Sequence, residues 1–243
     1  MKVHTAAGCG PFFEQRMGLR VLGHDPALPG SDSLERLLDE ADVLLFAVPI
    51  RRTVEVVDAC VARSAGREHG RLWLDITSIK QAPVAAMLCS QAEVVGLHPM
   101  VAPPKAPTLK GRVLVICEAR LGVWRGWVAQ LLDALQAECV RVSPEHHDRG
   151  MALIQAMVHA THLAQAGVLR EYAPVLGPPS ALLALRTASF ELDVAVMARI
   201  LSLNPQIYED IQFGNPYAID VLDRLLGELQ ALRGLLTAGD EGA

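Results

Sequence analysis

The first 143 residues alternate between short apolar runs and amphipathic stretches. Apolar runs bounded by turn-forming residues are typical of buried strands. Such runs cover residues 2–7, 19–25, 42–48, 71–76, 93–97, 112–118 and 139–143. Two intervening stretches, 31–40 and 123–136, have the apolar spacing of helices, and Ser31 or Asp32 is expected to cap the first. This alternation predicts a doubly wound α/β domain with a parallel sheet over residues 1–143.

The pattern changes at Pro144. From there on nothing alternates as a strand would, and apolar residues recur on a broad face at helical spacing. The longest stretches of this kind are 148–172, 181–203 and 217–238. We therefore predict an all-helical domain over residues 144–243. Its helices carry more apolar surface than a unit of about 100 residues can cover by itself, which favours a homodimer formed through this domain.

Composition narrows the class of protein. The chain has 243 residues, of which 51% are hydrophobic and 20% charged, enough for a well-filled core. Its 22 Lys and Arg are scattered and its formal net charge is −5, so we expect no nucleic-acid partner. Neither a membrane-spanning run nor a secretory signal is recognisable, and we expect a cytoplasmic protein. Five cysteines without a CxxC pair predict reduced thiols and no metal site.

A turn with two glycines, "GCGPFF" (residues 8–13), follows the first predicted strand. Gly8 and Gly10 match the first two glycines of a GxGxxG dinucleotide loop, with Phe13 in place of the third. Asp25 ends the second predicted strand, where a carboxylate accepts hydrogen bonds from the adenosine ribose of NAD. It lies only 17 positions after Gly8, so the first helix must be short. From these residues alone, an ordinary turn explains the segment as well as a Rossmann-like cofactor loop does.

Three more predicted strands end in polar or turn-forming residues. Val48 and Pro49 end the third, Thr77 and Ser78 follow the fourth, and His98 follows the fifth. Each has an ordinary explanation: a strand stop, a helix cap, and a histidine satisfied by a backbone group. The carboxyl ends of parallel strands nevertheless open onto one edge of a sheet. A hydroxyl and an imidazole are therefore expected to converge there, where a nicotinamide would lie.

The predicted helical domain contains polar residues in apolar surroundings. Gln155 and His159 lie one turn apart on one helix face, which indicates a polar cavity, although a satisfied core histidine is the alternative. Arg199 lies among apolar neighbours and needs an anionic partner. That partner is either a carboxylate of the chain, from Glu191 or Asp210, or a substrate carboxylate.

With these residues assembled, the chain resembles the prephenate/arogenate dehydrogenase family of tyrosine biosynthesis. Five segments carry the resemblance in family order: "ADVLLFAVPI", "LDITSIK", "GLHPMVAP", "HHDRGMALIQAMVHA" and "ELDVAVMARILSLNPQIYEDIQFGNP". Ser78, His98, His159 and Arg199 then match the family's active-site serine, two histidines and arginine. By the same resemblance, Gln155 lines the substrate pocket and Asp148 orients a helix.

The resemblance implies NAD-dependent oxidative decarboxylation of prephenate to 4-hydroxyphenylpyruvate. NAD would accept the hydride from the carbinol carbon, and loss of CO2 would aromatise the ring. His98 would take the hydroxyl proton, with Ser78 aligning it. Arg199 would pair with a substrate carboxylate, while His159 and Gln155 position the other end of the substrate.

The chain also departs from the family pattern. Phe13 replaces a glycine, the first helix is short, and Pro103 and Pro104 stand where family members commonly have a glycine and a polar or acidic residue. Three alternatives therefore remain beside prephenate: a dehydrogenase acting on arogenate, one acting on 4-amino-4-deoxyprephenate, or a binding or regulatory homologue without cofactor. The retained set Ser78, His98, His159 and Arg199 argues against the last.

Overall fold

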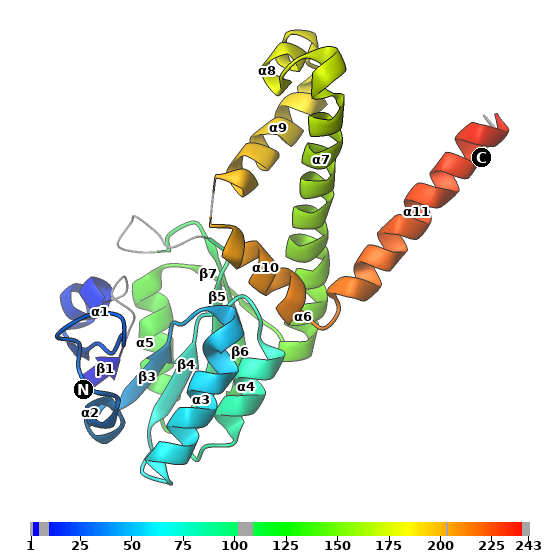
Figure 1. Cartoon of the computed structure of the whole chain (residues 1–243). Helices are drawn as coiled ribbons and strands as arrows, with labels where there is room; N and C mark the ends of the chain where they lie inside the picture. The colour runs from blue at the N-terminus through cyan, green and yellow to red at the C-terminus, as the bar shows by residue number, and fades with distance from the viewer. Residues whose placement is uncertain (1, 5–9, 102–108, 203, 240–243) are drawn as a thin grey trace. The chain divides into compact units, whose positions relative to one another are not determined.

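The computed structural model of the chain describes residues 2–4, 10–101, 109–202 and 204–239. Two compact units, Met1–Asp148 and Arg149–Ala243, make up the chain (Figure 1). The division between them and the boundary predicted at residue 144 both fall within helix α6 (Pro144–Met151). Gly8, Pro103 and Pro104, which the sequence analysis singled out, lie outside the described residues.

The first unit is built on a seven-stranded sheet of order β2-β1-β3-β4-β5-β6-β7. Its strands are β1 (Lys2–His4), β2 (Arg20–Leu22), β3 (Val43–Phe46), β4 (Leu72–Asp75), β5 (Glu93–Pro99), β6 (Val113–Arg120) and β7 (Glu138–Arg141). Each corresponds to one of the predicted apolar runs. The expectation of a wholly parallel sheet is wrong in one place: β5 and β6 are antiparallel, whereas every other neighbouring pair is parallel.

Helices cover both faces of the sheet, which confirms the doubly wound α/β class. In the first unit they are α1 (Gly10–Met17), α2 (Leu34–Glu40), α3 (Ile50–Ser64), α4 (Gln81–Leu88) and α5 (Arg125–Leu135), followed by α6. Side chains of α1 and α5 pack with Leu45 and Leu74 in one core cluster. Side chains of α2, α3 and α4 pack with Leu44 and Trp73 in a second cluster. Adjacent strand residues thus enter opposite cores, because successive side chains of a strand point to opposite faces.

The strand order creates a reversal point beside β1. The chain runs from β1 to β2 on one side and then crosses to β3 on the other, so β1 has parallel neighbours on both sides. In open α/β sheets the loops after two such strands diverge and leave a crevice at their carboxyl ends, where ligands bind. Val48 and Pro49 follow β3 at that edge.

The cap of α2 differs from the prediction. Ser33, rather than Ser31 or Asp32, is the N-cap, and its hydroxyl accepts a hydrogen bond from the backbone N–H of Arg36. The Ser31 hydroxyl instead donates to the carbonyl of Asp25. Three successive residues of good capping type make the exact start ambiguous in the sequence, and the contacts of this loop decide it.

The second unit is helical throughout its described part, as predicted. Its elements are η1 (Ala152–Met157), α7 (Val158–Leu176), α8 (Pro179–Leu182), η2 (Leu183–Leu185), α9 (Ala188–Leu201), α10 (Pro205–Gly214) and α11 (Ala218–Ala238). The segment η1 is a π-helix, a form that occurs mostly as single turns and frequently at functional sites. None of the helices described is both long enough and apolar enough to cross a membrane.

Candidate active site

His98 is the second-last residue of β5 and is only 3% exposed. The expectation that it lies in a loop after the strand is therefore wrong. Backbone pairing with β6 extends through His98, opposite Val115, and Pro99, opposite Leu114. A proline is tolerated at the end of a strand, so the ladder can continue two residues beyond the apolar run that predicted it.

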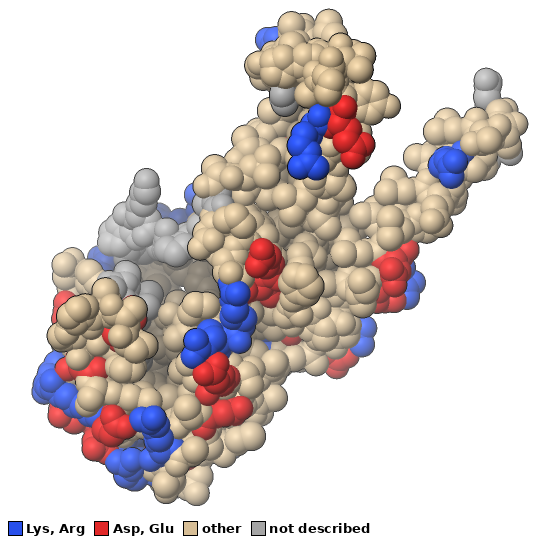
Figure 2. All heavy atoms as spheres, in the orientation of Figure 1, with Lys and Arg blue, Asp and Glu red and all other residues tan. Residues whose placement is uncertain are grey.

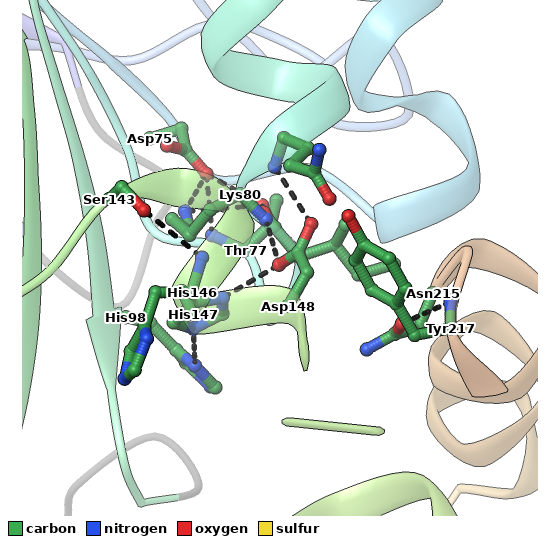
Figure 3. Close-up of polar contacts among 12 residues, drawn as sticks. Asp75, Thr77, Lys80, His98, Ser143, His146, His147, Asp148, Asn215 and Tyr217 are labelled. Carbon is green, nitrogen blue, oxygen red and sulfur yellow. Dashed lines mark hydrogen bonds and ion pairs between the residues drawn. The ribbon is translucent and has the colours of Figure 1, made fainter. Parts of the chain in front are cut away.

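A short series of hydrogen bonds begins at His98 (Figure 3). Its Nδ1 lies 2.9 Å from Nε2 of His147, and Nδ1 of His147 lies 2.7 Å from Oδ1 of Asp148. All three side chains are buried. His147 and Asp148 are neighbours in α6, so His98 meets a ring that lies 49 positions later in the sequence but within the same unit.

Asp148 also holds the start of α4. Its Oδ1 accepts the backbone N–H of Lys80 and its Oδ2 accepts the backbone N–H of Gln81, each at 2.8 Å. The prediction that Thr77 or Ser78 caps this helix is wrong. The Thr77 hydroxyl donates to Oδ2 of Asp75 at 2.6 Å. Ser78 is partly exposed and makes no side-chain hydrogen bond within the described residues, so its alignment with His98 stays a prediction.

A buried ion pair lies beside this series. Lys80 and Asp75 are both fully buried, and the Lys80 ammonium contacts Oδ2 of Asp75. Burial lowers the pKa of Lys80, and the Asp75 carboxylate opposes that shift. A Cβ at Gly96 would lie 2.9 Å from Cγ2 of Val84, 3.0 Å from Cδ of Lys80 and 3.1 Å from Oδ1 of Asp75, so a side chain at position 96 would force these neighbours apart. The glycine in "GLHPM" is thus explained by this close approach.

The surroundings of His98 keep its imidazole neutral. Burial is the largest cause, and electrostatic interactions with His147 and Lys80 add to it; together they lower the pKa of His98 to about 3. Since Nδ1 is engaged by His147, Nε2 is the nitrogen left to meet a substrate. The sequence analysis identified His98 but missed His147, Lys80 and Asp75. The segments "HHD" and "LDITSIK" contain them, yet nothing local indicates that they meet His98.

In the second unit, two residues predicted to bind substrate each have a buried polar atom without a partner in the described part of the chain. Oε1 of Gln155, in η1, and Nδ1 of His159, in α7, have no hydrogen-bond partner among the described residues. The ring of His159 packs edge-on against Tyr208, with centroids 4.6 Å apart. Burial, with a smaller contribution from His162, lowers the pKa of His159 below its ordinary value. Unpartnered buried polar atoms are rare in native structures, and a bound ligand is one reason for them.

Arg199 lies in α9 and is exposed. Neither of the protein carboxylates proposed as its partner serves that role within the described residues. Glu191 pairs with Arg186, and Oδ1 of Asp210 accepts a hydrogen bond from Nε2 of Gln206 at 2.9 Å. The charge of Arg199 acts on Tyr208, where it opposes the rise in pKa that burial causes. No ion pair of its guanidinium is found within the described part of the chain.

The residues expected to hold a nucleotide lie around the reversal point of the sheet. Gly10 begins α1 and Pro49 is the N-cap of α3, and neither helix has an acidic residue in its first turn. Phe13 is buried in the core beneath α1, in the place of the third glycine. Asp25, the third residue after β2, is exposed and accepts the backbone N–H of Ala27 at 2.9 Å. The N-cap of α3 makes no side-chain hydrogen bond, and helix N-termini without acidic residues at this edge suit the phosphates of a dinucleotide.

Comparison with known proteins supplies the family. Residues 30–142 match the nucleotide-binding domain of prephenate dehydrogenase, and residues 143–242 match the prephenate dehydrogenase dimerization domain. The chain belongs to the prephenate dehydrogenase family. The resemblance noted from the five sequence segments is thereby confirmed.

Curated relatives differ in their named substrates. A T-protein of Enterobacter agglomerans is 30% identical over 216 residues, covering 86% of this chain and 54% of the relative. A probable arogenate/prephenate dehydrogenase of Methanocaldococcus jannaschii is 26% identical, covering 83% and 45%. A 4-amino-4-deoxyprephenate dehydrogenase of Streptomyces pristinaespiralis is 30% identical over 237 residues, covering 92% and 73%. The chain thus spans about half the length of the first two.

Solved structures share the fold. Prephenate dehydrogenase of Aquifex aeolicus, in complex with hydroxyphenyl propionate and NAD+, has a TM-score of 0.77 at 18% identity, covering 99% of this chain and 92% of that one. Synechocystis arogenate dehydrogenase has a TM-score of 0.71 at 15% identity, covering 99% and 94%. At these identities the likeness supports the architecture and leaves the substrate open.

Proposed function

We propose that the chain is an NAD-dependent dehydrogenase that oxidatively decarboxylates a prephenate-class cyclohexadiene. One observation carries the proposal: a buried, neutral histidine, His98, stands at the carboxyl end of a strand with Nδ1 engaged and Nε2 available. A general base must be unprotonated at the working pH and held in a defined direction, and His98 meets both requirements. Membership of the prephenate dehydrogenase family supports the reaction class.

The proposed nucleotide site uses the sheet edge at the reversal point. Gly8 and Gly10 approach the pyrophosphate, Val48 and Pro49 line the turn after β3, and Asp25 accepts the ribose hydroxyls. The first turns of α1 and α3, both without acidic residues, support an anionic ligand at this edge. When bound there, NAD supplies the acceptor for the hydride.

The chemistry at the other reactant then falls to His98 and Ser78. Nε2 of His98 takes the proton of the ring hydroxyl as the carbinol C–H bond breaks and its hydride leaves. The bond to the ring carboxylate breaks next, CO2 departs, and the electron pair of that bond completes the aromatic ring. Ser78 keeps the hydroxyl in line with His98, a positioning role consistent with its unengaged side chain.

Residues of the helical domain are proposed to hold the substrate. Arg199 pairs with a carboxylate, since it makes no ion pair within the described part of the chain. Oε1 of Gln155 and Nδ1 of His159 gain the hydrogen bonds that they lack. Both atoms are buried, so a substrate that satisfies them is favoured over one that leaves them unpaired.

Prephenate is the substrate that we propose first, and 4-amino-4-deoxyprephenate is the second candidate. The second is favoured by the Streptomyces pristinaespiralis relative, which matches 92% of this chain at 30% identity. Arogenate dehydrogenation is the third possibility within the class. We further propose that the protein acts as a homodimer, because residues 143–242 match a dimerization domain.

One assay tests the activity and ranks the substrates. Reduced nicotinamide absorbance is followed with prephenate, arogenate and 4-amino-4-deoxyprephenate in turn, with NAD and with NADP. We expect turnover of one substrate with a preference for NAD, because Asp25 repels a 2'-phosphate. His98→Asn should lower kcat roughly 100-fold or more with KM changed only a few-fold. Turnover of none of the three, or calorimetric binding of neither nucleotide, would favour the cofactor-free homologue.

A further inference from the structure

His147 and Asp148 form a continuous support for His98. Nε2 of His147 lies 2.9 Å from Nδ1 of His98, and Oδ1 of Asp148 lies 2.7 Å from the other nitrogen of His147. The three side chains are between 0% and 3% exposed. Water therefore does not compete for these hydrogen bonds. In each contact one atom must carry the hydrogen and donate it, and the atom that it faces must accept it.

The backbone of α4 sets the direction of the series. Two N–H groups, from Lys80 and Gln81, donate to the carboxylate of Asp148, which fixes Asp148 as an acceptor. Nδ1 of His147 must then carry a hydrogen to donate to Asp148. A neutral imidazole has one N–H, so Nε2 of His147 is an acceptor.

The same reasoning passes to the next ring. Because Nε2 of His147 accepts, Nδ1 of His98 must donate, and the single hydrogen of neutral His98 resides on Nδ1. Nε2 of His98 is left with its lone pair, which is the state of a general base. The direction imposed at the first turn of α4 thus determines which nitrogen of His98 is basic.

We propose that His147 and Asp148 are positioning residues that fix the tautomer of His98, so that Nε2 is the nitrogen that accepts the substrate proton. When Nε2 of His98 gains that proton, Nδ1–H still donates to His147, and the new cation keeps its hydrogen bond. The consequence for catalysis rests on the function proposed above, whereas the tautomer itself is a property of the protein without substrate.

Asp148 alone could be a structural cap of α4, so the test must separate that role from tautomer control. Position 147 allows the separation, because His147 makes no hydrogen bond to α4. His147→Gln offers an amide oxygen that can accept from Nδ1 of His98. His147→Leu has similar volume and offers no acceptor. His146→Leu, at the exposed neighbouring histidine, is the matched control.

The kinetic measurement compares these variants on the substrate found to be turned over. We expect His147→Leu to lower kcat about tenfold or more with KM within a few-fold, because only the base is misdirected. His147→Gln should recover most of kcat, and His146→Leu should match the unmodified protein. A His147→Leu enzyme with unaltered kcat would overturn the proposal. So would equal losses in the Leu and Gln variants, which would indicate a structural role.

The spectroscopic measurement needs no substrate. In protein labelled with 15N-histidine, the ring nitrogens report the tautomer directly, and the signals of His98 are those missing in His98→Asn. We expect the Nδ1–H form of His98 in the unmodified chain and in His147→Gln. In His147→Leu the ring should revert to the Nε2–H form that free histidine prefers. An Nε2–H tautomer of His98 in the unmodified protein would overturn the proposal even if no substrate is ever turned over or if His147→Leu fails to fold.

Discussion

His98 is an ionisable residue that the fold keeps almost fully enclosed. It is 3% exposed, and its pKa is lowered to about 3 by burial and by electrostatic interactions with His147 and Lys80. The imidazole is consequently unprotonated throughout the physiological pH range. The same shift makes the stability of the folded state sensitive to acid, because at mildly acidic pH His98 binds a proton in the unfolded chain but not in the folded chain.

Stability should therefore fall as pH decreases below the pKa of an unfolded histidine, about 6.5. Between that value and about 3, only the unfolded state is protonated at position 98, so His98 lowers the free energy of unfolding by up to about 1.4 kcal/mol per pH unit. Urea unfolding at several values between pH 5 and 7.5, a range that covers the upper part of that window and the plateau above it, measures the slope. His98→Asn should flatten it; identical slopes in both proteins would show that His98 titrates normally.

Arg199 is the residue whose role depends most on a ligand. It makes no ion pair within the described residues, and the predicted internal partner Glu191 is engaged by Arg186. Arg199→Ala should raise KM by roughly tenfold or more and leave kcat within a few-fold, because it removes a charge-assisted contact to a substrate carboxylate. Arg186→Ala, which breaks an exposed ion pair of the same domain, is the control. An unchanged KM would exclude a carboxylate contact at this position.

Helix α1 shows how an element can depart from a motif without losing its place in the fold. It has only eight residues, and Phe13 occupies the position of the third glycine of the loop. That glycine normally permits close packing of helix on sheet. Here Phe13 is 5% exposed and belongs to the core cluster with Leu45 and Leu74. The helix therefore packs on the sheet through a large side chain that fills the space between them, and not through a close approach of the two backbones.

Restoring the motif should consequently damage the protein. We expect Phe13→Gly to lower the free energy of unfolding by about 3 to 5 kcal/mol, the range for removing a buried aromatic side chain. Phe12→Gly, at the neighbouring and only partly buried ring, should lower it less. Urea denaturation compares the two variants. If Phe13→Gly were as stable as the unmodified chain, the cluster would not depend on this side chain.

At the scale of the whole molecule, the two units differ in their surfaces. Figure 2 shows charged side chains of both signs interspersed over the first unit, whereas the face drawn of the second unit is mostly uncharged. Along α11, exposed leucines recur three or four residues apart: Leu226, Leu229, Leu232 and Leu236, which are between 54% and 76% exposed. An apolar stripe of this extent is typical of a surface that another protein covers.

We expect this stripe to belong to the homodimer interface, which should bury more than about 2,000 Å² in total. Leu229→Arg together with Leu232→Arg should convert the dimer to a monomer, because two cations would have to be buried. Light scattering at micromolar concentration measures the mass. Val123→Arg, which alters a residue 84% exposed in the other unit, should leave the dimer intact. A monomeric unmodified protein would contradict the assignment.

Most of the architecture was predictable from the sequence alone. Strands such as β3 and β4 are buried on both faces. Every position of β3 is apolar, as is every position of β4 but the last, so a local pattern reveals them. The change at Pro144 to helical spacing marked the second unit for the same reason. The order of the five family segments indicated Ser78, His98, His159 and Arg199, whose roles stay predictions.

Tertiary structure decided the features that depend on partners distant in the sequence. The hydrogen bond between His147 and His98 could not be predicted from the sequence, because the two residues are 49 positions apart and no local pattern links them. The cap of α4 likewise comes from Asp148, although Thr77 and Ser78 have the right chemistry beside it. A polar side chain can form hydrogen bonds with many different neighbours, and which of them it bonds depends on how the chain is packed. Apolar periodicity is different: it requires burial on a given face whatever the partner, so the sequence determines the elements while the fold determines the contacts that orient the base.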